Sequence, residues 1–328
     1  LSCAHQWAVV EMGMNQPGEM KRLSAIACPD IAVVTNTSGA HLEGLKTADN
    51  VALAKAQIFD HAQKNSTAIF FRDDPRAHIL EAGAKNNPDI TQILSFGSCE
   101  TADVSATDIQ VSENRIWFTA KIRNRSARFH INSPARFMVS NALAALAAAS
   151  AAGIPICHMQ AGLAAFTPAS GRMDIRCLPN GIQLIDDTYN ANPASVTQAL
   201  KTLTAQAAAA GQEHKGQTIA VLGDMLELGG ASEALHYELG RTAAQLGITC
   251  LYLFGPQSGH TRRGAVDNGM ARNRIFCGTK QEIADHVLAH AGRNDWILVK
   301  GSRGMAMETI IQHWESLMAP ESRKTEKA

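Results

Sequence analysis

The residues best suited to chemistry gather in one polar stretch, 186–193, which holds two carboxylates and two carboxamides. It follows the apolar run 182–185, which we predict as a strand, and precedes a run of helix formers, 193–210. Polar groups between the carboxyl end of a strand and a helix with proline in its first turn are typical of ligand sites in open α/β sheets. An ordinary strand-to-helix turn with Asn192 as the helix N-cap would use the same residues, so the stretch alone does not decide between the two.

Other polar side chains also follow predicted strands. Because the carboxyl ends of parallel strands lie at one edge of a sheet, we expect such groups to converge on a cleft. A glutamate with a histidine favours Mg²⁺ holding a polyphosphate over a closed zinc site. The Lys-Gly-Ser-Arg run at 300–303 combines cationic side chains with the start of a predicted helix, and both features favour binding of an anionic group. The set comprises Glu11, Asn36 and His41 in the first half of the chain and Asp187, Asp224, Lys300, Ser302 and Arg303 in the second.

Each of these residues also has a purely structural explanation. His41 could be a hydrogen-bonded structural residue, Glu11 a surface charge, and Lys55 a solvated side chain on a helix. Asp224 could stabilise the start of a helix through the helix dipole. Only the set as a whole favours a functional site.

In the first part of the chain, strands alternate with helices, which predicts βαβ units and a parallel sheet. The predicted strands are 7–10, 31–34 and 67–71, and the predicted helices are 17–27, 49–63 and 75–85. From residue 93 to 131 apolar and polar residues alternate instead, which predicts an antiparallel meander on the edge of the first domain. Its strands are expected at 103–111, 115–122 and 127–131.

A helix at 138–152 and a turn-rich linker at 166–171 separate this part from a second doubly wound unit. The strands of that unit are expected at 182–185, 218–222, 249–254 and 296–299, with helices at 193–210, 231–246, 282–291 and 305–318. The fold class is therefore α/β, with a domain over 1–168, a Rossmann-like doubly wound domain over 169–320, and a charged, disordered tail at 321–328.

Composition excludes several classes of protein. The chain has 328 residues, with 30 Lys and Arg against 30 Asp and Glu, so it has no overall charge to attract nucleic acid or an acidic membrane. The longest nearly apolar run, 142–152, is too short to cross a bilayer, which takes about 20 residues. Seven cysteines without CxxC spacing indicate reduced thiols in a cytosolic protein. The chain starts with leucine, close to a predicted strand, which suggests a truncated start.

The usual phosphate-binding motifs are also missing. The dipeptide Gly-Lys occurs nowhere, and no two glycines lie two positions apart. The sequence therefore contains neither a P-loop nor a Rossmann GxGxxG motif, which disfavours a nicotinamide-dependent oxidoreductase.

From about residue 7 to 318 the ordered motifs resemble the Mur ligase family. In the first half these are EMGMN (11–15), PGE (17–19), TN (35–36), HLEG (41–44), AK (54–55), NALAA (141–145) and GRM (171–173). In the second half they are DDTYNANP (186–193), VLGDMLELG (221–229) and VKGSRGMAME (299–308). The second set is the more specific. It resembles the family members that join D-alanyl-D-alanine to UDP-N-acetylmuramoyl-tripeptide.

The resemblance implies a cytoplasmic, ATP-dependent ligase of peptidoglycan precursor synthesis. In such an enzyme the tripeptide carboxylate is phosphorylated to an acyl phosphate, which the dipeptide amine then attacks. The region 1–168 would be the central ATP-binding domain without its P-loop strand. The uridine-binding N-terminal domain would also be missing, so we expect this fragment to be inactive and to bind ATP weakly by itself. A relic or binding module that holds nucleotide or D-alanyl-D-alanine without ligase activity is the alternative.

The resemblance also implies roles for individual residues. Glu11, His41 and Lys55 fall at Mg²⁺-site positions. At the position of Lys55, family members carry a carbamylated lysine. The positions implied for ATP contact are Asn141, Arg172 and Asp187, and those for the dipeptide and domain closure are Asn190, Asn192, Asp224, Lys300, Ser302 and Arg303. This chain has Phe137-Met138 where many members have a histidine before the Asn141 helix, so one adenine contact is in doubt.

Overall fold

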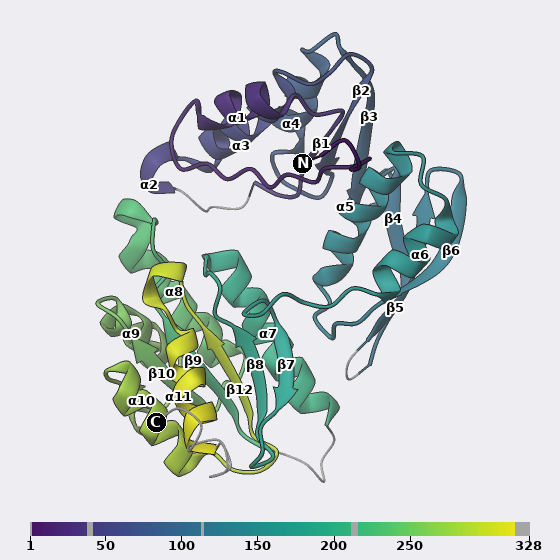
Figure 1. Cartoon of the computed structure of the whole chain (residues 1–328). Helices are drawn as coiled ribbons and strands as arrows, with labels where there is room; N and C mark the ends of the chain where they lie inside the picture. Colours follow the sequence, from purple (N-terminus) through teal and green to yellow (C-terminus); the bar gives the residue numbers. More distant parts are fainter. Residues whose placement is uncertain (1, 38–41, 113–114, 211–215, 319–328) are drawn as a thin grey trace. The chain divides into compact units, whose positions relative to one another are not determined.

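The computed structural model of the chain describes residues 2–37, 42–112, 115–210 and 216–318 (Figure 1). It forms two compact units, of which the first comprises residues 1–110, 117–131 and 137–165. The second consists of 166–328 together with the short segments 111–116 and 132–136. Each unit is built around a six-stranded sheet in which most neighbouring strands are parallel, so the predicted α/β class is confirmed. His41 and the predicted tail 321–328 lie outside the described residues.

The sheet of the first unit follows chain order, from β1 to β6. Its strands are β1 (Ile31–Val34), β2 (Ser66–Phe71), β3 (Ile90–Gly97), β4 (Val104–Val111), β5 (Ile116–Ile122) and β6 (Arg125–Ile131). Strands β1 to β4 are joined by parallel pairs, and β3 was not predicted from sequence. The consecutive positions of β4, β5 and β6 are those a meander requires.

Helices bury the apolar side chains of this sheet. Val51, Phe59 and Leu80 pack in one cluster with Ala68 and Phe70 of β2. The last long helix of the unit, α5, contacts β1, β2 and β3. The helices are α1 (Glu19–Ala27), α2 (Leu42–Leu45), α3 (Ala48–Ala56), the 3₁₀ turn η1 (Gln57–Phe59), α4 (Ala77–Lys85), α5 (Met138–Ala151) and α6 (Ile156–Ala164).

The strand predicted at 7–10 is wrong. These residues form no strand, and Trp7, Val9 and Val10 are all exposed, Val9 completely. In the described part of the chain β1 is a sheet edge and pairs only with β2. An apolar run becomes a strand only where a neighbouring strand satisfies its backbone groups, and this run has no such neighbour.

The sheet of the second unit has the order β11-β10-β9-β12-β8-β7. Its strands are β7 (Asp174–Cys177), β8 (Gln183–Asp187), β9 (Thr218–Gly223), β10 (Cys250–Phe254), β11 (Ile275–Cys277) and β12 (Trp296–Lys300). All neighbours are parallel except β7, a short edge strand antiparallel to β8. From β9 the chain proceeds outward to β10 and β11 and then returns to β12. The strand order therefore reverses between β9 and β12, and ligands bind at such a switch point in open α/β sheets.

Helices cover both faces of this second sheet, as the doubly wound prediction requires. One face packs Ile283 and Val287 of α10 and Trp314 of α11 against Val221 and Val299. On the sheet's remaining surface α7 contacts β9 and β12, and α9 contacts β10. The helices are α7 (Pro193–Ala209), η3 (Gly229–Ala231), α8 (Ser232–Gln245), α9 (Ser258–Asp267), η4 (Arg272–Arg274), α10 (Lys280–His290), η5 (Arg303–Met305) and α11 (Glu308–Met318).

Two further structural findings bear on the composition. None of the seven cysteines forms a disulfide. Among the residues described, no helix combines the length and the apolar character needed to span a bilayer.

Candidate functional site

Three strands of the second unit bring predicted site residues to one edge of its sheet. Strand register aligns Lys300 of β12 with Asp187 of β8 on one side and with Leu222 of β9 on the other. Asp224 directly follows Gly223, the last residue of β9. The expectation that polar groups after these strands would share one edge is therefore confirmed (Figure 1).

Lys300 and Asp187 form the centre of this edge. The Lys300 Nζ atom donates to Asp187 Oδ2 at 2.5 Å and to the carbonyl of Asn190 at 2.7 Å. Lys300 is only 2% exposed, so its ammonium group has lost nearly all contact with solvent. Burial lowers the pKa of Lys300 and raises the pKa of Asp187, and in each residue the opposite charge of the partner opposes the shift. The pair holds the 187–190 turn against the end of β12.

The segment before β7 supplies a second group of contacts to Asp187. The Asp187 Oδ1 atom accepts the backbone N–H of Met173 at 3.1 Å. The Arg172 guanidinium lies 4.0 Å from the centre of the Tyr189 ring, a cation–π contact on an exposed surface. Gly171 has a φ of 73°, and a Cβ there would lie 3.1 Å from Thr188 Oγ1, so the tight approach requires glycine.

Ser302 connects the loops after three strands. Its hydroxyl donates to the carbonyl of Ala191 at 3.1 Å and accepts the N–H of Leu226 at 2.8 Å. Its own N–H donates to the carbonyl of Asp224 at 3.1 Å. Because Ser302 is 4% exposed, water cannot replace these partners easily. A single buried residue thus fixes the loops after β8, β9 and β12 relative to one another.

Asp224 is held by backbone and histidine contacts. Its Oδ2 atom accepts the N–H of Gln257 at 2.9 Å, and His236 Nε2 lies 3.9 Å from Oδ1. That Nε2 atom accepts the N–H of Met225, while His236 Nδ1 donates to the carbonyl of Ser232 at 2.8 Å, which fixes a neutral tautomer. Burial is the main cause that raises the pKa of Asp224, opposed by the Gln257 hydrogen bond.

The remaining predicted residues of the second unit have mostly structural contacts. Asn192 caps α7, since its side chain accepts the N–H of Ser195 at 2.9 Å. This is the structural role that the sequence analysis gave as the alternative to a ligand contact. Asp186 is buried and accepts both the N–H and the hydroxyl of Thr188. Asn190 is exposed beside the Lys300 contact, and the exposed Arg303 pairs with Glu308 at 2.8 Å.

In the first unit, Lys55 lies against the end of β1. Its Nζ atom donates to the carbonyl of Asn36 at 2.7 Å. Burial lowers the pKa of Lys55, although the nearby Asp74 carboxylate opposes the shift. Asp74 in turn accepts the N–H and the hydroxyl of Thr37, both at 2.6 Å. Lys55 is therefore a half-buried residue of this strand end, which corrects the interpretation of a solvated helix side chain.

The other predicted residues of this unit have fewer contacts. Glu11 is exposed and lies outside any helix or strand. Asn141 is exposed on α5, with its amide 3.4 Å from Met138 Sδ. Within the part of the chain that the structure describes, no three His, Cys, Asp or Glu side chains are placed to hold a metal ion together. Because His41 is not described, the predicted Glu11–His41–Lys55 set stays a prediction.

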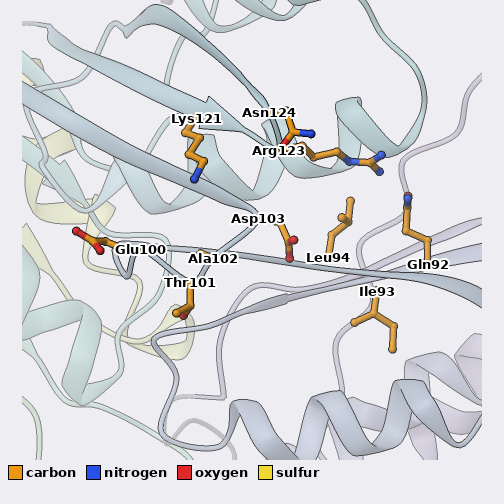
Figure 2. A pocket seen from close by; sticks show the side chains of 10 residues that line it. All are labelled: Gln92, Ile93, Leu94, Glu100, Thr101, Ala102, Asp103, Lys121, Arg123 and Asn124. Atoms are coloured by element: carbon orange, nitrogen blue, oxygen red, sulfur yellow. The ribbon is translucent and has the colours of Figure 1, made fainter.

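A groove of about 460 Å³ opens elsewhere in the first unit (Figure 2). It lies beside β3, with Gln92, Ile93 and Leu94 on one side and Lys121, Arg123 and Asn124 on the other. The Asp103 carboxylate in its wall already accepts the N–H and the hydroxyl of Ser95, both at 2.8 Å. None of the predicted site residues lines this groove.

Sequence reasoning missed several residues that shape the β8–β12–β9 edge. Met173 and Gln257 act through their backbone N–H groups, which no side-chain pattern can reveal. Gly255 has a φ of 122°, and a Cβ there would lie 2.5 Å from the Asp224 carboxyl group. Ser232 and His236, four residues apart on α8, follow the motif 221–229 and belong to the resemblance to the Mur ligases, but the sequence analysis assigned them no role.

Comparison with known proteins agrees with this two-unit architecture. Residues 2–149 match the Mur ligase middle domain, and residues 171–303 match the domain described as Mur ligase, glutamate ligase domain. The chain is 32% identical over 307 residues to UDP-N-acetylmuramoyl-tripeptide–D-alanyl-D-alanine ligase of Bacillus subtilis, with 93% of this chain and 63% of that protein covered. The corresponding Escherichia coli ligase is 31% identical, with 95% and 66% covered.

Solved structures give the same result. The chain resembles MurF from Acinetobacter baumannii with a TM-score of 0.84 and 29% identity, covering 96% of this chain and 66% of that one. It also resembles a MurF ligase from Thermotoga maritima in complex with ADP, with a TM-score of 0.75 and 25% identity, covering 94% and 66%. The chain thus spans slightly less than two thirds of the length of these relatives.

Proposed function

Since the chain belongs to the Mur ligase family, we propose that it is the ATP-binding and C-terminal part of a ligase that joins D-alanyl-D-alanine to UDP-N-acetylmuramoyl-tripeptide. The observation that carries the proposal is the buried Lys300–Asp187 pair with Arg172 beside it, at the carboxyl edge of the second sheet. These residue types suit a nucleotide, and family relatives of this structure include an ADP complex.

The groups at this edge fit the parts of a nucleotide. Each Asp187 oxygen accepts one hydrogen bond within the protein, and a carboxylate has about four acceptor positions. It can therefore still accept ribose hydroxyls. Among the described residues Arg172 has no carboxylate within ion-pair distance, so its guanidinium N–H groups remain available for phosphate oxygens. In the first unit, the exposed Asn141 amide is our candidate for a further contact to the nucleotide.

The fit of Mg²⁺ depends on the chemistry of Lys55. Mg²⁺ takes oxygen ligands, which a lysine amine does not supply but a lysine carbamate does. The lowered pKa of Lys55 increases the fraction of free amine, the form that adds CO₂. We therefore propose that carbamylated Lys55, with Glu11 and His41, holds Mg²⁺. Bound there, the ion would neutralise phosphate charge and so favour the approach of an anionic carboxylate.

In the proposed reaction the tripeptide carboxylate attacks the γ-phosphorus of ATP, the bond to ADP breaks, and an acyl phosphate forms. The amine of D-alanyl-D-alanine then attacks the acyl carbon and loses a proton, and phosphate leaves from the tetrahedral intermediate. The residues of this chain bind and orient these groups. Asn190, the Asp224 loop and the 300–303 turn are our candidates for the dipeptide, because Ser302 fixes all three loops together.

Nucleotide binding tests the first part of this proposal. The chain is titrated with a fluorescent ATP analogue in the presence of Mg²⁺, and Arg172→Ala is compared with Arg262→Ala, an exposed arginine on α9. Because a hydrogen bond to a charged group contributes about 1.5–3 kcal/mol, Arg172→Ala should weaken binding at least about tenfold. Equal affinities of the two variants would contradict the assignment.

Phosphate release in the presence of all three substrates tests the expectation that this chain is inactive by itself. Release that depends on the tripeptide and on D-alanyl-D-alanine supports a ligase and contradicts that expectation. Nucleotide binding without release agrees with the expected inactivity. Carbamylation is tested separately by ¹³C NMR after addition of ¹³C-bicarbonate, where a carbamate signal should appear in the parent chain and be absent in Lys55→Arg.

A further inference from the structure

Strand β3 of the first unit is covered by neighbouring strands on only part of its length. On one side it pairs with β2 from Ile90 to Phe96. On the other side, in the described part of the chain, it pairs with β4 only at Phe96 and Gly97. Burial follows this pairing, because residues 94–97 are buried whereas residues 90–93 are exposed or half-buried. The first half of this central strand therefore has a free edge on the β4 side.

The backbone of Ile93 lies on this free edge. The N–H of Ser95, two residues later, points to the β4 side, where the Asp103 carboxylate accepts it at 2.8 Å. Because alternate residues of a strand present their backbone N–H and C=O groups to the same edge, those of Ile93 also face the β4 side. Within the described residues neither group has a hydrogen-bond partner on that side. An open strand edge of this kind is a template for pairing with a further chain.

The groove beside this edge holds two cations without a counter-charge. Lys121 on β5 and Arg123 in the turn after it are both exposed and line the groove. In the ranges that the structure describes, neither side chain has a carboxylate within ion-pair distance. Of the two carboxylates at the groove, Asp103 already accepts two hydrogen bonds from Ser95, and Glu100 points away from the other lining side chains (Figure 2). The groove therefore presents net positive charge to a ligand.

The groove has the size and the lining that a short stretch of chain requires. Its volume of about 460 Å³ lies in the range of about 300–1,000 Å³ that is typical of ligand sites. Leu94 and Ala102 contribute buried apolar surface, and Asn124 brings an exposed amide group to the rim. Because the rim is exposed, an extended chain can enter the groove and leave it again.

We propose that this groove binds an extended, acidic peptide segment of a partner protein, which adds as a strand beside β3. The N–H and C=O of Ile93 pair with the peptide backbone, the mode in which a peptide extends an exposed sheet edge. Side chains of an extended peptide alternate between two faces, so carboxylates at every second position can meet Lys121 and Arg123. A nucleic acid would use the two cations but leave the backbone of Ile93 unpaired.

The test is a fluorescence anisotropy titration of the full chain with a labelled hexapeptide in which glutamate and valine alternate. A second peptide has glutamine in place of glutamate, and a third keeps the glutamates but carries N-methyl groups on its backbone amides. The protein variants are Lys121→Gln/Arg123→Gln and, as a matched control, Arg125→Gln. Arg125 is exposed on the same hairpin and does not line the groove. All three substitutions are at exposed side chains, and no nucleotide or ligase assay is needed.

We expect saturable binding of the glutamate peptide, with at least about tenfold weaker binding by the double variant and at least about tenfold weaker binding of the glutamine peptide. Arg125→Gln should match the parent chain. The N-methylated peptide should not bind, because it cannot donate to the strand edge. Bound peptide should also slow hydrogen exchange of the Ile93 amide more than that of Leu94, which already faces β2.

Four results would overturn the proposal. The first is no saturable binding of the glutamate peptide at millimolar concentration. The second is equal affinity of the N-methylated peptide or of the double variant, since either would show that the edge or the cations take no part. The third is tighter binding of a single-stranded RNA of equal charge through the same two cations. The fourth is a dimer of the parent chain that the double variant lacks, which would make a second copy the occupant.

Discussion

Lys300 donates a 2.5 Å hydrogen bond to Asp187 across the paired strands β12 and β8, at the last aligned position of their register. The ammonium is almost fully buried, and its other acceptor is the backbone carbonyl of Asn190. The Lys300 ammonium has almost no access to solvent, whereas the Asp187 carboxylate is partly exposed. The pair therefore couples the geometry of the candidate site to the stability of the second unit.

Removing both members of this pair should cost less stability than the sum of the two single removals. Asp187→Asn leaves a buried ammonium without a counter-charge, and we expect it to lower the free energy of unfolding by about 3 kcal/mol or more. In the double variant Asp187→Asn/Lys300→Met no buried charge remains unpaired, so its loss should be clearly smaller than the sum of the two single losses. Urea denaturation of the four proteins gives this coupling energy, and additive losses would rule out the interaction.

The stability of the chain should carry a pH-dependent penalty from Asp224. Because burial raises its pKa, the folded carboxyl group holds a proton at pH values where the unfolded one has lost it. The folded state then binds more protons, so this residue's contribution to stability falls as pH rises from the ordinary value near 3.8 through the folded pKa.

Asp224→Asn removes that titration and keeps an acceptor for the N–H of Gln257. The free energy of unfolding of the variant, relative to that of the parent chain, should therefore be higher at pH 7 than at pH 4. Chemical denaturation at the two pH values measures the difference. A variant that instead loses more stability at pH 7 would show that the carboxylate is stabilised by its surroundings.

Gly255 should be intolerant of any side chain. Its φ of 122° is a conformation that L-residues rarely adopt, and a Cβ would lie 2.5 Å from the Asp224 carboxyl group. We expect Gly255→Ala to destabilise the chain by about 2 kcal/mol or more through strain and overlap. Gly259→Ala is the matched control, since nothing lies within 4 Å of its Cβ position and it sits in α9. The control should be neutral or stabilising in a thermal melt.

Ser302→Ala should weaken the connection among the three loops. The substitution leaves the N–H of Leu226 without its acceptor and removes the donor to Ala191. We expect a loss of about 1–3 kcal/mol in the free energy of unfolding. Ser316→Ala, which removes one hydrogen bond on the exposed side of α11, should change it by less than about 0.5 kcal/mol. Hydrogen exchange should show faster opening of the 224–229 loop only in Ser302→Ala, and equal exchange in both variants would refute the connecting role.

The sequence by itself determined the class of fold and the edge on which the site lies. Strong periodic segments such as those at β2, β9 and β12 were found because buried parallel strands are continuous apolar runs between turns. Their order along the chain, with helices between them, placed Asp187, Asp224 and Lys300 after strand ends. Parallel pairing brings such ends together, so this part of the site followed from sequence.

Short or polar elements were missed because packing rather than local preference forms them. β7 and β11 have four and three residues, and each is an edge strand defined by its neighbour. α9 is polar and glycine-containing, and it forms where Gly240 and Gly264 let it approach α8, since a Cβ at either glycine would meet backbone of the other helix at 1.9 Å. The apolar run 7–10 shows the reverse case, in which strand-forming residues without a partner stay exposed.

Only the tertiary structure decided which polar groups touch. Lys300 and Asp187 are 113 residues apart in sequence, and Ser302 and Ala191 are 111 apart. The choice of Lys300 as the partner of Asp187, and of Asn192 as a helix cap, depends on strand register and burial rather than on residue type. The sequence names the groups that can do chemistry. The register of β8, β9 and β12 determines which of these groups are buried next to one another. A buried charge must pair with a neighbouring polar group, because it is no longer in contact with water.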